Sequence, residues 1–120
     1  MVKVMIVDDT VFARKRWARF LSSCGYEVVE AENGADAVRL YVEKKPDAVL
    51  MDIAMPEMDG VAALNGIRRA HPDAKVLLLA SPGQEVVGRQ GIKLGARGLI
   101  IRPFQPQEVL STLESVLGVG

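Results

Sequence analysis

Three acidic residues stand directly after short apolar runs, where their carboxylates could act together. Asp8 and Asp9 follow the run Val4–Val7, and Asp52 follows the run Ala48–Met51. If these runs are neighbouring parallel strands, their carboxyl ends meet at one edge of the sheet, where such sheets bind ligands. Three anions so close together repel one another unless a hard cation lies among them. The pattern therefore predicts a site for Mg²⁺ and phosphate chemistry.

The elements that position these residues follow from the hydrophobic pattern, in which short apolar runs alternate five times with stretches of helical periodicity. The expected strands are Val2–Val7, Glu27–Ala31, Ala48–Met51, Val76–Ala80 and Gly98–Ile101. The last three are apolar throughout, as strands covered on both faces should be, whereas the second is more polar and is expected at an edge. The alternation predicts an α/β fold, with helices on both faces of a parallel sheet.

Five helices are expected between and after the strands. The first is expected to stop at Gly25, the second to begin with a cap at Asn33, and the third to run from about Val61 to Ala70. The fourth is expected to begin after Ser81-Pro82 and stop at Gly95, and the fifth to start near Pro106. The buried stripe of the first helix is predicted to contain Ala13, Trp17, Phe20, Leu21 and Cys24. Its other face carries a basic cluster of Arg14, Lys15, Arg16 and Arg19. Such a cluster is most often a solvated helix face, and docking to an acidic partner is the alternative.

Length and composition limit the classes of function. The 120 residues, 49% of them hydrophobic, are expected to form one domain with one sheet-centred core. Fifteen basic and fifteen acidic residues balance, so no general electrostatic attraction to nucleic acid or to an anionic membrane is expected. Cys24 is the only cysteine, which excludes an internal disulfide. No apolar run is long enough for a signal peptide or a membrane span, so a cytoplasmic location is expected.

Three segments together resemble the response-regulator receiver family. They are Asp8–Asp9, the stretch Lys45–Gly60 and Arg102–Phe104. From Asp52 the central stretch reads Asp-x-x-Met-Pro-x-Met-Asp-Gly. One acidic residue alone would be interpreted as a solvated loop residue, but the three segments at these intervals are specific. The similarity covers essentially the whole chain and is greatest to single-domain, chemotaxis-type regulators, so residues 1–120 are expected to form one receiver domain.

The resemblance implies a flavodoxin-like, three-layer αβα fold with a doubly wound sheet of strand order 2-1-3-4-5. It implies that Asp52 accepts a phosphoryl group from the phosphohistidine of a sensor kinase or phosphotransfer protein. Mg²⁺ would be bound by the side chains of Asp9 and Asp52, by the backbone carbonyl of Ala54, and through water by Asp8. The chain would be a signalling protein rather than an enzyme, and it would contact a target protein through its last strand and the two flanking helices.

Three positions depart from the usual receiver pattern. Arg102 stands where receivers normally carry a lysine, which keeps the positive charge but replaces a compact ammonium by a planar fork. Ala80 stands where a hydroxyl is usual, and Leu99 where an aromatic switch residue is usual. We therefore expect phosphorylation with an altered conformational response. The alternative is a pseudo-receiver that binds a partner whatever the state of Asp52.

Ser81 has two interpretations. Its hydroxyl reaches the phosphoryl site if the preceding strand end is bulged by one residue. Alternatively, Ser81-Pro82-Gly83-Gln84 is a capping box with Ser81 as N-cap, which we favour because capping needs no special strand geometry. By the same resemblance, Arg102–Pro103 is a candidate cis peptide bond.

Two enzyme classes fit poorly. A haloacid-dehalogenase-type phosphatase needs a second aspartate two residues after the first, where this chain has Ala54. A nicotinamide-binding fold needs Gly-x-Gly-x-x-Gly after its first strand, where this chain has Asp-Asp-Thr.

Overall fold

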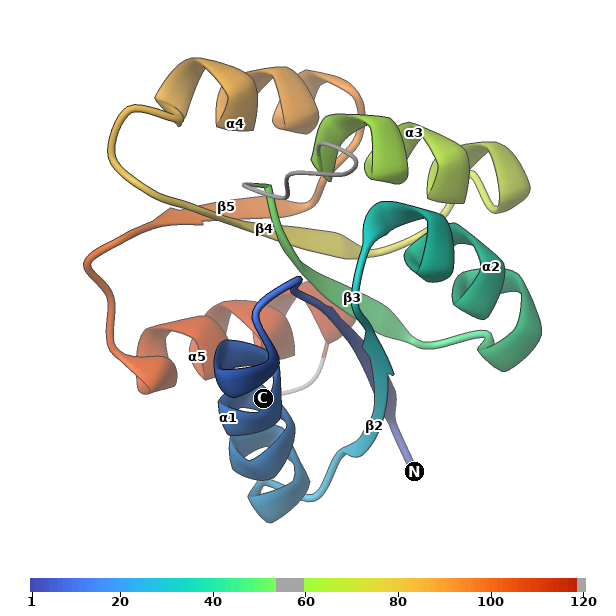
Figure 1. The fold of residues 1–120 in the computed structure, drawn as a ribbon, viewed down its shortest axis with the longest axis vertical. Coiled ribbons are helices and arrows are strands. Elements are labelled where there is room, and N and C mark those ends of the chain that lie inside the picture. Colours follow the sequence, from blue (N-terminus) through green and yellow to red (C-terminus); the bar gives the residue numbers. More distant parts are fainter. Residues whose placement is uncertain (54–59, 119–120) are drawn as a thin grey trace.

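A computed structural model describes residues 1–53 and 60–118, and these form strands and helices in strict alternation (Figure 1). The strands are β1 (Lys3–Val7), β2 (Glu27–Ala31), β3 (Ala48–Asp52), β4 (Val76–Ala80) and β5 (Gly98–Ile101). The helices are α1 (Val11–Ser23), α2 (Gly34–Lys44), α3 (Gly60–Ala70), α4 (Glu85–Lys93) and α5 (Pro106–Leu117). The predicted order of elements is confirmed, and β3 extends one residue further than predicted, to include Asp52.

All neighbouring strands pair in parallel in the order β2-β1-β3-β4-β5, as the family resemblance implied. The polar β2 lies at an edge, as predicted. One expectation about burial was wrong: β5 is the other edge strand, and all four of its residues are partly exposed. An apolar sequence therefore did not distinguish an edge strand from a central one.

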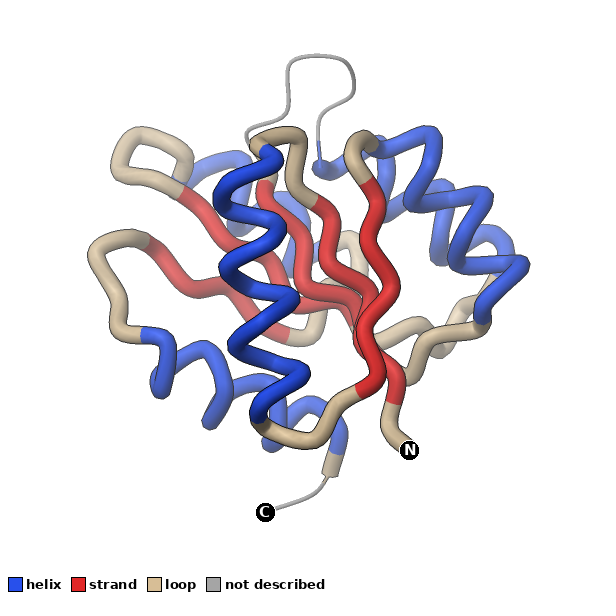
Figure 2. Tube along the Cα trace, turned by 60° about the horizontal axis from the view of Figure 1, so that its bottom comes forward, coloured by secondary structure: helices blue, strands red, loops and turns tan. Residues whose placement is uncertain are grey.

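Helices cover both faces of the sheet (Figure 2). The sheet separates two apolar cores, because successive side chains of each strand point to opposite faces. One core contains side chains of α2 and α3, such as Tyr41 and Ile67. Helix α4 packs on the same face, where its Gly88 approaches Leu99 of β5. The other core contains Leu21 of α1 and Leu113 of α5. A side chain at the end of a strand therefore lies on the same face of the sheet as the side chain two residues before it.

Two predicted helix starts had different outcomes. The side chain of Asn33 accepts a hydrogen bond from the backbone N–H of Asp36 at 2.8 Å, so the predicted cap of α2 is confirmed. Ser81 is not an N-cap, because α4 begins four residues later and Gln84 precedes it. Residues 81–84 form a tight turn, in which the backbone N–H of Gln84 donates to the carbonyl of Ser81 at 3.0 Å. The turn leaves the Ser81 hydroxyl available to the carboxyl edge of the sheet.

The first helix differs from its predicted faces at two residues. Cys24, placed on the buried stripe, is exposed because it lies beyond the last turn of α1. Arg14, placed on the solvated basic face, is buried, with 8% of its surface exposed. Helix α1 therefore buries a charge next to the acidic loop that precedes it.

No helix in the described part of the chain combines the length and the apolar character that a membrane span requires.

Candidate functional site

The strand register brings the two acidic segments together at the carboxyl edge of the sheet. Val7 of β1 pairs with Met51 of β3, so the next residues on the two neighbouring strands are Asp8 and Asp52. Adjacent strands lie about 4.8 Å apart. The structure therefore places these two carboxylate-bearing residues side by side, and Asp9 follows on the same loop.

Asp8 is buried, with 4% of its surface exposed. Burial is the main cause that raises the pKa of its carboxyl above the ordinary value, and the negative charges of Asp52 and Asp9 raise it further. The backbone N–H of Thr10, which donates to Asp8 Oδ1 at 2.9 Å, and the charge of Arg102 act in the opposite direction. The three carboxylates thus form an electrostatically unfavourable group, which a bound cation would relieve.

Asp52 is held by the residue that replaces the usual lysine. Arg102 Nη2 lies 3.1 Å from Asp52 Oδ2, and Arg102 Nη1 donates to the Ser81 hydroxyl oxygen at 3.4 Å. The strand order explains this arrangement, because β4 lies between β3 and β5 and Ser81 directly follows β4. The Arg102–Pro103 peptide bond is cis, as the resemblance implied.

Alternation along the strands explains why Ser81, and not Ala80, reaches this group. Ala80 is fully buried in the core on the α2–α3 face of the sheet. Asp52 falls on the other parity, two residues after Leu50, which packs in the core of α1 and α5. Ser81, one place after Ala80, shares that parity. The Ser81 hydroxyl, one residue after the position where receivers usually carry it, therefore contacts the guanidinium beside Asp52.

Leu99, at the position of the usual aromatic switch residue, lies beneath α4. A Cβ atom built on Gly88 would come within 2.6 Å of Leu99 Cδ2, so the glycine leaves the space that this leucine occupies. The α4 backbone therefore packs directly on the leucine.

The residues present suit Mg²⁺, although the described chain holds no closed cage for it. Within residues 1–53 and 60–118, no three acidic, histidine or cysteine side chains stand close enough to form a metal site by themselves. Mg²⁺ in phosphoryl-transfer sites is typically bound by one or two carboxylates, with water and phosphate oxygens completing the shell. Asp8, Asp9 and Asp52 offer such hard oxygen donors. The predicted backbone ligand, Ala54, lies outside the described residues.

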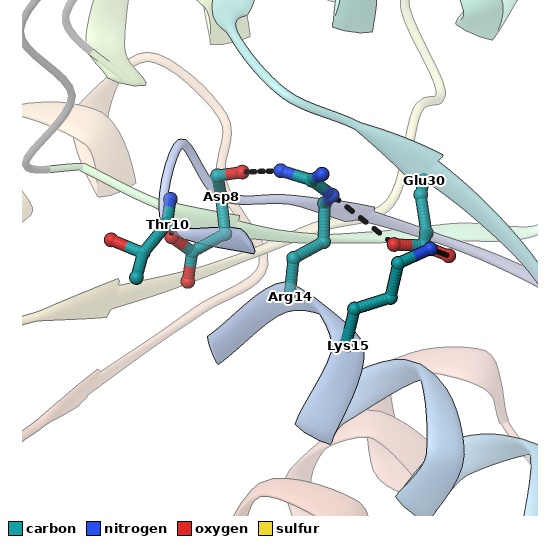
Figure 3. A network of polar contacts seen from close by, with 5 residues as sticks. All are labelled: Asp8, Thr10, Arg14, Lys15 and Glu30. Atoms are coloured by element: carbon teal, nitrogen blue, oxygen red, sulfur yellow. Dashed lines mark hydrogen bonds and ion pairs between the residues drawn. The ribbon is translucent and has the colours of Figure 1, made fainter. Parts of the chain in front are cut away.

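Arg14, predicted on the solvated face of the first helix, instead contacts the acidic loop. Its Nη1 donates to the backbone carbonyl of Asp8 at 2.8 Å, and its Nε donates to Glu30 of β2 at 3.1 Å (Figure 3). Arg14 lies seven residues before the fully buried Leu21, so both fall on one stripe of the helix. That spacing was the available signal for its burial.

The raised pKa of Asp8 predicts a pH dependence of stability. The native state binds this proton more tightly than the unfolded state, so its contribution to stability falls as pH rises above the ordinary value of 3.8. In EDTA, Asp8→Asn should remove this loss and increase the free energy of unfolding at pH 7. Urea titrations between pH 4 and 7 measure the difference. If the stability of Asp8→Asn followed the wild-type curve at every pH, Asp8 would not be the source of the pH dependence. Asp73→Asn, which changes an exposed acid before β4, is the control and should follow the wild-type curve.

Comparison with known proteins now identifies the family. Residues 4–114 match the family model of the response regulator receiver domain. The chain belongs to the response-regulator receiver family. It is accordingly a receiver of two-component signalling, a signalling protein rather than a classical enzyme, and a receiver implies a histidine kinase as partner.

Several single-domain receivers resemble this one along nearly their whole length. The chemotaxis protein CheY of Thermotoga maritima is 44% identical over 115 residues, which cover 95% of this chain and 96% of that protein. CheY of Bacillus subtilis is 42% identical over 116 residues, 96% and 97% of the two chains. Among solved structures, a Vibrio cholerae chemotaxis protein superposes with a TM-score of 0.84 at 30% identity, covering 97% of this chain and 98% of that one. A receiver domain protein of Clostridium thermocellum gives a TM-score of 0.94 at 22% identity, with 98% and 95% covered, and supports the fold alone.

Proposed function

We propose that Asp52 accepts a phosphoryl group from the phosphohistidine of a sensor kinase or phosphotransfer protein. The observation that carries this proposal is the position of its carboxylate. It stands at the end of β3 beside Asp8, is 14% exposed, and lies 3.1 Å from a guanidinium. The carboxylate oxygen would attack phosphorus, the bond from phosphorus to the histidine nitrogen would break, and an acyl phosphate would form.

Mg²⁺ belongs to this proposal, with Asp9 and Asp52 as side-chain ligands, the Ala54 carbonyl as a third, and Asp8 acting through water. When bound, the ion supplies positive charge to the oxygens of the transferring group. Burial, together with the negative charges of Asp52 and Asp9, raises the pKa of Asp8, and a cation bound beside these carboxylates would offset that cost, which supports the assignment.

Arg102 and Ser81 would contact the phosphoryl group. A guanidinium has donors in a rigid fork, so Arg102 can bind a phosphoryl oxygen with one N–H while another remains on Ser81. In this proposal Ser81 supplies the hydroxyl that Ala80 cannot. Positioned donors of this kind act where charge spreads over the oxygens in the transition state.

The phosphorylated receiver would signal through the face of α4, β5 and α5 to a target protein in the cytoplasm. Exposed apolar side chains of α4 and its end support a protein-binding role: Val86, Val87, Ile92 and Leu94. Leu99 beneath Gly88 supports an altered response, because a leucine lacks the aromatic ring that the usual switch moves.

A second candidate is a pseudo-receiver that binds its partner independently of phosphorylation. The ion pair between Arg102 and Asp52 favours it, because a cation already neutralises the carboxylate. The two candidates differ in one measurable outcome, which is whether Asp52 becomes phosphorylated.

The decisive experiment is incubation with Mg²⁺ and acetyl phosphate, followed by intact-mass and peptide mass spectrometry. The proposal expects one phosphoryl group on the peptide that contains Asp52, and expects EDTA to abolish it. If neither acetyl phosphate nor a phosphorylated histidine kinase modifies Asp52, the pseudo-receiver is the correct function.

The basic face of α1 gives a prediction about the kinase. Arg14 is buried, and Lys15 is exposed but forms an ion pair with Glu30 at 2.9 Å. Arg16 and Arg19 are the other two exposed cations of the basic cluster. Both line a groove whose aromatic walls are Trp17, Phe20 and Phe104. Reversing both charges to glutamate should slow transfer from a phosphorylated kinase by about 10-fold at low salt, because steering by complementary charge is lost. The rate with acetyl phosphate should stay unchanged, and an unchanged kinase rate would exclude this face.

A further inference from the structure

The acidic loop between β1 and α1 is held at its backbone by contacts from two other elements. The backbone N–H of Asp8 donates to the carbonyl of Ala31, at the end of β2, at 3.1 Å. The carbonyl of Asp8 accepts from Arg14 Nη1 at 2.8 Å. The carboxylate of Asp8 accepts from the N–H of Thr10 at 2.9 Å. Residue 8 is thus fixed at its N–H, its carbonyl and its side chain.

The arginine that makes the carbonyl contact is itself fixed. Its Nε donates to Glu30 Oε1 at 3.1 Å, and Lys15 binds the other oxygen of the same carboxylate at 2.9 Å. The Arg14 side chain is only 10% exposed, and Glu30 is 28% exposed. A buried guanidinium requires such a partner, and the pair fixes the plane of its fork. Figure 3 shows Arg14 between Glu30 on β2 and the carbonyl of Asp8.

The carbonyl that Arg14 contacts belongs to the peptide unit that joins Asp8 to Asp9. A peptide unit is planar, so the position of its oxygen also determines the direction of the next N–H and Cα. Asp9 is exposed, and its carboxylate depends on this backbone for its direction. The contact between Arg14 and the Asp8 carbonyl therefore fixes the direction in which the Asp9 backbone continues after β1.

We propose that Arg14 is a positioning residue for the divalent cation site: oriented by Glu30, it holds the Asp8–Asp9 peptide and thereby aims the Asp9 carboxylate. The inference rests on the proposed function, because it assigns Arg14 a part in the cation binding that phosphorylation of Asp52 requires. Arg14 touches neither the ion nor the phosphoryl group. Its effect should appear in Mg²⁺ affinity before it appears in any reaction.

The test is calorimetric titration of the full chain with Mg²⁺, at a temperature where every variant is folded by circular dichroism. Arg14→Met should weaken Mg²⁺ binding by about 10-fold or more, the loss typical when a residue that orients a metal ligand is removed. Arg69→Met, a change of an exposed arginine near the end of α3, should bind Mg²⁺ as the wild type does. Equal dissociation constants for Arg14→Met and wild type would overturn the proposal.

Glu30→Ala provides a second route that leaves Arg14 in place. It should weaken Mg²⁺ binding in the same direction, and the double variant should bind no more weakly than Arg14→Met alone, because both changes break one unit. Additive losses of affinity in the double variant would overturn the proposal. No loss in Glu30→Ala would overturn it even if Arg14→Met failed to fold. A wild type that is phosphorylated on Asp52, with Arg14→Met unchanged in affinity, would refute only this inference. A wild type that binds no Mg²⁺ would refute the proposed function with it.

Discussion

Asp52→Asn should lose the phosphoryl adduct that acetyl phosphate produces on the wild type, with a rate lower by about 10³-fold or more, as expected when a nucleophile is removed. An amide oxygen carries no full negative charge and does not form a stable acyl phosphate. Asparagine has nearly the same size and keeps an acceptor for Arg102, so the fold and the contact at 3.1 Å should persist. Intact mass spectrometry in Mg²⁺ measures the adduct directly.

The control for this variant is Asp73→Asn, which changes an exposed acid in the loop before β4. This loop lies at the amino ends of the strands, opposite the site. It should be phosphorylated at the wild-type rate. If Asp52→Asn acquired the adduct as fast as the wild type, the phosphoryl group would reside on another residue, and peptide mapping would identify it.

Arg102→Met should slow phosphorylation by about 10²-fold to 10³-fold, the range observed when one preorganised donor to the transition-state charge is removed. It should at the same time bind Mg²⁺ at least as tightly as the wild type, because a positive charge beside Asp52 and near Asp8 has been removed. This opposite movement of rate and metal affinity distinguishes a role in transfer from general damage to the site. Stopped-flow kinetics and calorimetry measure the two quantities.

Arg102→Lys tests whether the fork matters beyond its charge. The lysine restores the usual family residue and keeps the positive charge, but it cannot bind Asp52 and Ser81 in the same planar geometry. We therefore expect the phosphorylation rate to fall by less than about 10-fold. Ser81→Ala should slow phosphorylation of the wild type more than it slows that of Arg102→Met, because the hydroxyl and the guanidinium contact each other and act on the same phosphoryl group. Equal phosphorylation rates for Arg102→Met and wild type would mean that the guanidinium does not act on the transferring phosphoryl group.

The altered positions Ala80, Ser81 and Leu99 have a common structural setting. Ala80 and Leu99 both face the core on the α2–α3 side of the sheet, and Leu99 packs under Gly88. Ser81 lies on the other side, with Asp52 and Arg102. In this chain the hydroxyl at the site and the residue beneath α4 therefore belong to opposite faces by strand alternation. A phosphoryl group that binds Ser81 would not pull on Leu99 directly, which agrees with the expectation of an altered conformational response.

The sequence by itself determined the order of the elements and the place of the acidic residues at strand ends. Apolar runs and helical periodicity are local properties, and parallel strands must bring their carboxyl ends to one edge, so Asp8 and Asp52 followed from pattern alone. The cap at Asn33 was predictable for the same reason, since it is formed within three residues.

Only the tertiary structure decided which side chains complete the site. Ser81 was interpreted as a helix cap because capping can be judged locally. Its contact with Arg102 depends instead on β4 lying between β3 and β5, and on which face of the sheet each residue occupies. Arg14 was assigned to a solvated face because charged side chains are usually solvated. Its burial is favourable because its guanidinium has two partners, the carboxylate of Glu30 on β2 and the backbone carbonyl of Asp8. Local periodicity does not show which residues pair across strands or between side chain and backbone, and these pairings surround Asp52 and the acidic loop.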